Sequence, residues 1–134
     1  MRKAILFLTG FFLLLIACSQ KLTEEEQALA DAKEMAEESY KALFAGQYDT
    51  FLHHRAGGDS LPESYRKQMI ETYKQFRYLL EKEHGGINSF KVSNALRDTT
   101  LDMIHVFLVL NFADSIQEEI VVPMVEENGS WKVK

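Results

Sequence analysis

Four histidines are the side chains best able to bind a metal ion or to transfer a proton, and none has a metal-ligand spacing. His53 and His54 are adjacent, so on a helix their side chains diverge and cannot both bind one metal ion. His84 and His105 each stand alone, without the second histidine and intervening glutamate of a helical zinc motif. No nucleotide-binding fingerprint occurs either, so we expect neither a metal site nor a cofactor.

Cys18 is the one cysteine of the chain, and it follows a segment with the order of an export signal. Arg2 and Lys3 give a positively charged start, residues 4–16 are almost entirely apolar, and the small Ala17 precedes the cysteine. The apolar run is shorter than the roughly 20 residues that a transmembrane helix needs. We expect residues 1–17 to be a signal peptide that is cleaved before Cys18. The alternative is a plain signal peptide cut elsewhere, with Cys18 inert.

The segment Leu15-Ile16-Ala17-Cys18 resembles the lipobox of bacterial lipoproteins, in which the cysteine thiol is diacylated and the cysteine becomes the new N-terminus. The resemblance implies palmitate-type acyl chains on Cys18, with the membrane as the first partner of the protein. Several chains hold far more firmly than one, because each buried CH₂ contributes on the order of 0.8 kcal/mol. Ser19, rather than Asp, follows the cysteine, which implies the outer membrane of the cell envelope rather than the inner one.

Cleavage would leave 117 of the 134 residues and change the formal net charge from −5 to −7, because Arg2 and Lys3 are lost. An acidic chain of this size fits one domain and is a poor partner for nucleic acid, whose phosphates demand a basic surface. With its only cysteine acylated it has no disulfide, so packing alone must hold it together. We expect a tether over residues 18–22 and a single α+β domain over residues 23–134.

Helical patterns occupy the first part of this domain. Thr23 and Glu26 have the spacing of a capping box, and apolar residues at intervals of three and four predict a helix that stops at Gly46. Asp49 is a plausible cap for a short second helix. Residues 60–63 predict a second capping box, which opens a third helix that runs to about residue 83.

Beyond the third helix the hydrophobic period changes to two, which predicts strands. Residues 100–113 are apolar on both faces, as expected of a central strand covered on each side. Pro123 cannot donate to a β-ladder, so it marks an edge position or a bulge in the strand over residues 116–126. Asn128-Gly129 predicts a two-residue hairpin turn into a final strand over residues 130–134.

Three helices followed by four antiparallel strands, the last being Gly129-Ser130-Trp131-Lys132-Val133, resemble the nuclear-transport-factor-2-like superfamily, also called cystatin-like. The lipobox and the segment Ala45-Gly46-Gln47-Tyr48-Asp49 add a narrower resemblance to small lipoproteins of unknown function, many of them from gut Bacteroidetes. The resemblance implies an α+β fold in which N-terminal helices pack on a bent four-stranded antiparallel sheet around a conical cavity. Such folds host enzymes, ligand binders and oligomerisation modules alike.

A cavity of that kind would be lined here by apolar and aromatic side chains. The inward face of the central strand carries no ionisable group, although catalytic acids and bases must lie within hydrogen-bond reach of the substrate. Tyrosines on the buried helix stripes are either additional lining or core aromatics whose hydroxyls reach water or a carbonyl. The candidate pocket-lining residues are Tyr40, Tyr65, Tyr73, Ile104, Val106 and Leu108.

The opposite face of the central strand is a second candidate site. It carries His105, Phe107, Val109 and Asn111, which predict a binding patch or, with more weight, a sheet face buried in a homodimer or under a loop.

These patterns favour a lipid-anchored cell-envelope domain that binds a small apolar ligand or an envelope protein and is not an enzyme. The alternative of a small isomerase- or hydratase-type enzyme would need His53, His54 or Asp102 at the mouth of the cavity. A homodimeric scaffold module, formed through the outer sheet face, is the third interpretation.

Overall fold

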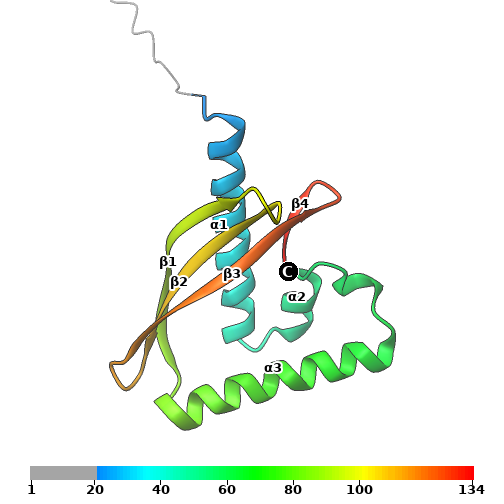
Figure 1. The fold of residues 1–134 in the computed structure, drawn as a ribbon. Helices are drawn as coiled ribbons and strands as arrows, with labels where there is room; N and C mark the ends of the chain where they lie inside the picture. Colours follow the sequence, from blue (N-terminus) through cyan, green and yellow to red (C-terminus); the bar gives the residue numbers. More distant parts are fainter. Residues whose placement is uncertain (1–20) are drawn as a thin grey trace, which may run out of the picture.

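The computed structural model describes residues 21–134, so Cys18 and the segment before it lie outside the described residues (Figure 1). The predicted order of helices and then strands is confirmed. The elements are α1 (Glu24–Phe44), α2 (Tyr48–His53), the 3₁₀ turn η1 (Gly58–Ser60), α3 (Glu63–His84), β1 (Ile87–Asp98), β2 (Met103–Phe112), β3 (Gln117–Glu127) and β4 (Ser130–Val133). Within residues 21–134 no helix combines the length and the apolar character needed to cross a bilayer.

The predicted capping box opens α1. The Glu26 N–H donates to Thr23 Oγ1, and the Thr23 N–H donates to Glu26 Oε2, both at 3.1 Å. Two of the four N–H groups that a helix start leaves unpaired are thereby satisfied. The buried side of α1 carries the small residues Ala32 and Ala36, both 0% exposed, which allow the helix to lie close against the sheet.

α3 lies across the lower end of α1 and the sheet in Figure 1. It follows Pro62 and has no side-chain cap, so the capping box predicted over residues 60–63 is wrong. The reason is that Ser60 belongs to η1 and therefore does not occupy the cap position. α3 ends at Gly85, whose φ of 75° is the left-handed conformation that glycine supplies at helix ends. Of the 22 residues of α3, Tyr73 alone is buried.

The four strands form one antiparallel sheet in the order β1-β2-β3-β4, which curves around α1 (Figure 1). Two register shifts in β1, one of them between Val92 and Asn94, are of the kind that bends a strand. β2 is the central strand, as predicted, and its alternate side chains from Ile104 to Phe112 are at most 2% exposed. They form one core with Ala36 and its neighbours on α1, so α1 fills the concave side of the sheet.

β3 and β4 are joined by the predicted two-residue turn. Asn128 and Gly129 have φ values of 52° and 79°, and two left-handed residues are what a type I′ hairpin requires. Pro123 accepts a hydrogen bond from the Lys134 N–H at 2.9 Å, just beyond the last β3–β4 pair. Because the nitrogen and the carbonyl of one strand residue point to the same side, the missing N–H faces the side where β4 ends. β3 itself lies between β2 and β4, and Pro123 pairs with His105 of β2 without a register shift, so the predicted edge position or bulge is wrong. The proline is accommodated because β4 ends at Val133, next to it.

Candidate functional site

A cleft of about 230 Å³ opens between the three helices. Each helix supplies side chains from one face, because residues three and four apart on a helix lie side by side. The chain segment directly after α2 adds the one basic group. The lining residues are Tyr40 and Leu43 from α1, Phe51 from α2, Arg55 after α2, and Thr72, Tyr73 and Phe76 from α3.

The rings in the cleft wall hold one another in fixed orientations. Phe51 stands edge-on to Tyr40, with ring centroids 5.5 Å apart, and edge-on to Tyr73, with centroids 4.8 Å apart. Edge-to-face contacts at these distances are the favoured geometry for aromatic pairs. Phe51 thus links the two tyrosines, one from α1 and one from α3.

The Tyr73 hydroxyl is buried and has no hydrogen-bond partner among the described residues, while the whole residue is only 6% exposed. Burial raises the pKa of Tyr73 and likewise that of Tyr40, and the positive charge of Arg55 opposes part of both rises. Arg55 therefore lies near both hydroxyls, and its N–H groups as well as its charge oppose the rise in the pKa of Tyr73. The contact with the Tyr73 hydroxyl is looser than the distance and angle of a hydrogen bond, so the hydroxyl still lacks a partner among the described residues. A buried polar group left without a partner costs about 1–3 kcal/mol, so an acceptor placed here would be stabilised.

Arg55 is positioned by the end of the chain. The Ala56 N–H donates to the Val133 carbonyl and the Val133 N–H donates to the His54 carbonyl, each at 2.8 Å. Arg55 Nη2 donates to the Lys134 main-chain oxygen at 3.2 Å. Within residues 21–134 no acidic side chain forms an ion pair with Arg55. Since a guanidinium has five N–H donors, most of them remain available.

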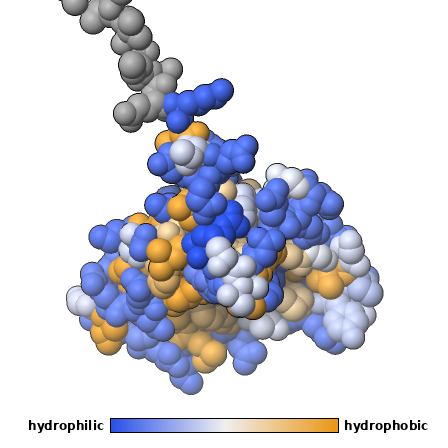
Figure 2. Space-filling view, turned by 45° about the horizontal axis from the view of Figure 1, so that its top comes forward, coloured by the Kyte–Doolittle hydropathy of each residue, from blue (hydrophilic) through white to orange (hydrophobic). Residues whose placement is uncertain are grey.

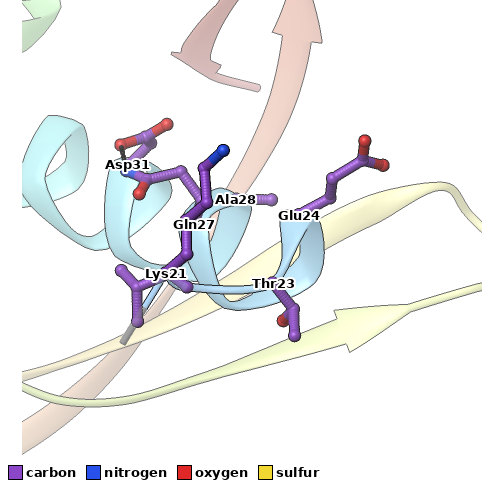
Figure 3. A pocket seen from close by; sticks show the side chains of 7 residues that line it. Lys21, Thr23, Glu24, Gln27, Ala28 and Asp31 are labelled. Carbon is purple, nitrogen blue, oxygen red and sulfur yellow. Dashed lines mark hydrogen bonds between the residues drawn. The ribbon is translucent and has the colours of Figure 1, made fainter. Parts of the chain in front are cut away.

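A larger cleft of about 450 Å³ lies at the start of α1 (Figure 3). Six of its seven lining residues are exposed, and none of the seven is aromatic. Gln27 Nε2 donates to Asp31 Oδ1 at 2.7 Å, so these two polar groups already satisfy each other. Its lining residues are Lys21, Leu22, Thr23, Glu24, Gln27, Ala28 and Asp31. With no buried polar group awaiting a partner, this cleft is the weaker candidate.

Two of the predicted pocket-lining residues, Tyr40 and Tyr73, lie together in the cleft between the helices. Tyr65 does not join them, because it sits near the start of α3 with 59% of its surface exposed. Ile104, Val106 and Leu108 are 0% exposed and belong to the core between the sheet and α1. In this fold they pack against α1 instead of facing the cleft.

The residues predicted as an interface share the outer face of β2. His105, Phe107, Val109 and Asn111 are each partly exposed. His105 Nε2 lies 3.3 Å from Asp98 Oδ2. Neighbouring strands extend the apolar part of this face, since Val121 pairs with Phe107 and is 50% exposed. In the view of Figure 2, which brings the start of α1 forward, hydrophobic residues are interspersed with hydrophilic ones.

The residues of the enzyme alternative lie apart from the cleft. His53 Nδ1 is 2.7 Å from Asp59 Oδ1 at the surface, and the side chain of Asp102 is 98% exposed. His54 Nδ1 lies 3.1 Å from Ser39 Oγ. Desolvation, followed by the charges of His53 and Lys132, lowers the pKa of His54. Among the described residues no three potential metal ligands come together.

Sequence patterns did not point to Arg55, Phe51, Thr72 or Phe76 as cleft residues. Phe51 and Phe76 carried a helical apolar signal, which indicates burial but not which helix is the neighbour. Arg55 carried no signal at all, because its place depends on pairing with Val133, far along the chain.

No protein-family model matches the sequence, and no curated protein sequence matches it. Among solved structures, the crystal structure of a Campylobacter jejuni protein provisionally described as an NTF2-like transpeptidase matches with a TM-score of 0.59, over 75% of this chain and 94% of that chain. The chain therefore has an NTF2-like fold. The two sequences are 10% identical, so the likeness concerns the NTF2-like fold alone. The narrower resemblance to small lipoproteins stays a prediction.

Proposed function

We propose that this NTF2-like protein is a lipid-anchored cell-envelope protein that binds a small ligand, without catalysing a reaction, in the cleft between α1, α2 and α3. The Tyr73 hydroxyl carries the proposal, because it is buried at the cleft wall and finds no partner within residues 21–134. The walls are mostly apolar and aromatic with a few polar groups, which is the usual composition of small-molecule sites. A cleft of about 230 Å³ is smaller than the usual site for a drug-sized molecule, so the ligand is small.

Anchoring through Cys18 would attach the membrane at the end of α1 that lies farther from this cleft. Residues 19–23 separate the acylated cysteine from α1, and five residues span at most about 18 Å. Tyr40 lies 16 residues beyond the start of α1, about 24 Å along the helix axis. The start of α1 would therefore stay within reach of the lipid surface, and the length of α1 would allow the cleft at its other end to lie clear of it.

The enzyme alternative has less support. The description of the Campylobacter jejuni protein as a transpeptidase would require an attacking nucleophile if carried to this chain. Ser39 is close to His54 but is 0% exposed, and its hydroxyl proton is donated to the Met35 carbonyl at 2.6 Å. His54 Nδ1 must therefore donate to Ser39 Oγ, so it cannot act there as the base that activates the serine.

The scaffold alternative draws support from the outer sheet face. Leu96 and Val121 are 54% and 50% exposed on the strands either side of β2. Leu96 pairs with His105 and Val121 with the partly exposed Phe107. If this face formed a homodimer, Val121→Lys would place two charges in the interface and give a monomer. Glu118→Lys, on the concave face of the same strand, is the matched control for size-exclusion chromatography with light scattering.

Native mass spectrometry of the protein, purified from its own envelope in mild detergent, tests the proposed function. The expected result is a small mass that is lost on denaturation. Thr72→Trp, which fills the cleft, should abolish the bound mass, whereas Thr99→Trp at an exposed turn should retain it. A bare monomer would contradict the proposal, and a bare dimer would favour the scaffold alternative.

A further inference from the structure

The residues that line the cleft also indicate the chemical class of its ligand, an inference that rests on the proposed function. Arg55 is the only charged residue among the seven that line the cleft. The whole chain is acidic, with a formal net charge of −5, and yet no described acidic side chain pairs with this arginine. The wall of the cleft thus carries one positive charge that no acidic side chain within residues 21–134 pairs with, and whose contact to the main chain is the hydrogen bond to the Lys134 oxygen.

The polar groups beside that charge are phenol hydroxyls. The Tyr73 hydroxyl is buried and has no partner in the part of the chain that the structure describes. Tyr40 lines the same cleft and touches the same Phe51 ring. A ligand oxygen here would accept from a guanidinium N–H and from a phenol O–H. A carboxylate suits this arrangement, because its two oxygens only accept and can take several donors at once.

The number of charges in the cleft and its volume limit which small molecules it can bind. A single arginine balances one negative charge, which favours a carboxylate over a dianionic phosphate. The remaining walls, from Leu43, Phe51 and Phe76, are apolar and suit a hydrocarbon or aromatic body. If each water-sized group occupies about 30 Å³, the cleft of about 230 Å³ holds on the order of eight such groups.

We infer that the cleft binds a small organic monocarboxylate, with its carboxylate held by Arg55 and the Tyr73 hydroxyl and its apolar body against Phe51 and Phe76. Arg55 contributes charge and planar N–H donors, and Tyr73 contributes one buried donor that no described residue uses. Tyr40 closes the side of the cleft formed by α1.

Three acids and their neutral amides test this inference on the full-length protein in mild detergent: benzoate, 4-hydroxyphenylacetate and hexanoate. Saturation-transfer NMR titrations would compare each acid with its amide. At least one acid should bind ten-fold or more tightly than its amide. Arg55→Gln should remove that preference, and Arg55→Lys should retain part of it, which separates lost charge from lost folding.

Two tyrosine variants test whether the Tyr73 hydroxyl contributes to binding of the acid. Tyr73→Phe should weaken binding of the preferred acid about three- to ten-fold, because one hydrogen bond to a charged group is lost. Tyr65→Phe, on the same helix but 59% exposed, should leave binding unchanged. Equal losses in both variants would overturn the role of the buried hydroxyl.

The NMR titrations test the carboxylate inference, and native mass spectrometry tests separately whether the cleft binds any ligand. If no acid binds more tightly than its amide, or if the preference survives in Arg55→Gln, the carboxylate inference is overturned. A mass that native spectrometry finds in the wild type but not in Thr72→Trp would still uphold the cleft as a binding site. If that mass is missing as well, the proposed function falls with the inference.

Discussion

The Tyr73 ring meets the Phe51 ring edge-on, at an interplanar angle of 88° and a centroid distance of 4.8 Å. This contact between α3 and α2 fixes the ring of the one buried residue of α3. It thereby also fixes the place of a hydroxyl that has no partner among residues 21–134. The ring stabilises the helix packing, while the hydroxyl costs free energy that a bound acceptor would recover.

Tyr73→Phe is therefore expected to stabilise the unliganded protein. The variant keeps the ring contacts with Phe51 and removes an unpaired buried polar group, so the free energy of unfolding should rise by about 1 kcal/mol. Urea unfolding followed by Trp131 fluorescence measures the change. Tyr65→Phe removes an exposed hydroxyl of the same helix and should change stability by less than about 0.5 kcal/mol. A Tyr73→Phe variant less stable than the wild type would mean that the hydroxyl is satisfied within the protein.

The fold was more predictable from the sequence than the cleft, because the two depend on different kinds of signal. The Thr23–Glu26 capping box and the Asn128-Gly129 turn are encoded by residues a few positions apart, so local chemistry defines them. The central position of β2 followed from its two apolar faces. The superfamily resemblance supplied the remaining step, from a list of elements to an α+β sheet wrapped around a helix.

The cleft depends instead on contacts between distant segments. Tyr40 and Tyr73 were predicted as pocket lining from helical stripes, but Tyr65 follows the same period and is exposed. Periodicity defines a stripe on α3, but it does not reveal which part of that stripe the other helices cover. Arg55 reaches the cleft only because Val133 pairs with the segment after α2.

The capping box of α1 should contribute measurably to stability. Thr23→Ala removes the acceptor of the Glu26 N–H and should lower the free energy of unfolding by about 1 kcal/mol. Glu26→Gln keeps a side chain that can still accept from the Thr23 N–H, so its effect should be smaller. Thermal unfolding monitored by circular dichroism would rank the two variants. Thr99→Ala, at an exposed turn, is the matched threonine control, and a similar loss in it would argue against the cap.

Asp98 should make the free energy of unfolding of the domain depend on pH in the acid range. The Leu101 N–H, the His105 side chain and the Thr100 N–H all hydrogen-bond its carboxylate, and together they hold its pKa below the usual value. Because the pKa of Asp98 is lower in the folded state, its charge contributes fully to the free energy of unfolding above the pKa of the unfolded state, about 3.9. That contribution is lost as the pH falls through the pKa of the folded state.

Asp98→Asn is thus expected to be less stable than the wild type at pH 7, and the two should converge as the pH falls below about 4. Urea unfolding at intervals between pH 3 and pH 7 gives the free energy of unfolding of each protein as a function of pH. Glu118→Gln is the control, since within residues 21–134 no ion pair or hydrogen bond involves the Glu118 side chain. Parallel curves for wild type and Asp98→Asn would show that the charge of Asp98 contributes nothing to folding.

The proposed membrane attachment through Cys18 can be tested by removing the thiol. Cys18→Ser removes the thiol that would be acylated, so the protein should either leave the membrane fraction or accumulate with residues 1–17 still attached. Fractionation of the envelope with mass spectrometry distinguishes these two forms from the acylated one. Ser19→Ala leaves the thiol in place and should remain acylated and membrane-bound. If Cys18→Ser persisted in the membrane as a chain without residues 1–17, the lipid anchor would be refuted. The cleft between α1, α2 and α3 would then belong to a protein held at the envelope by other contacts.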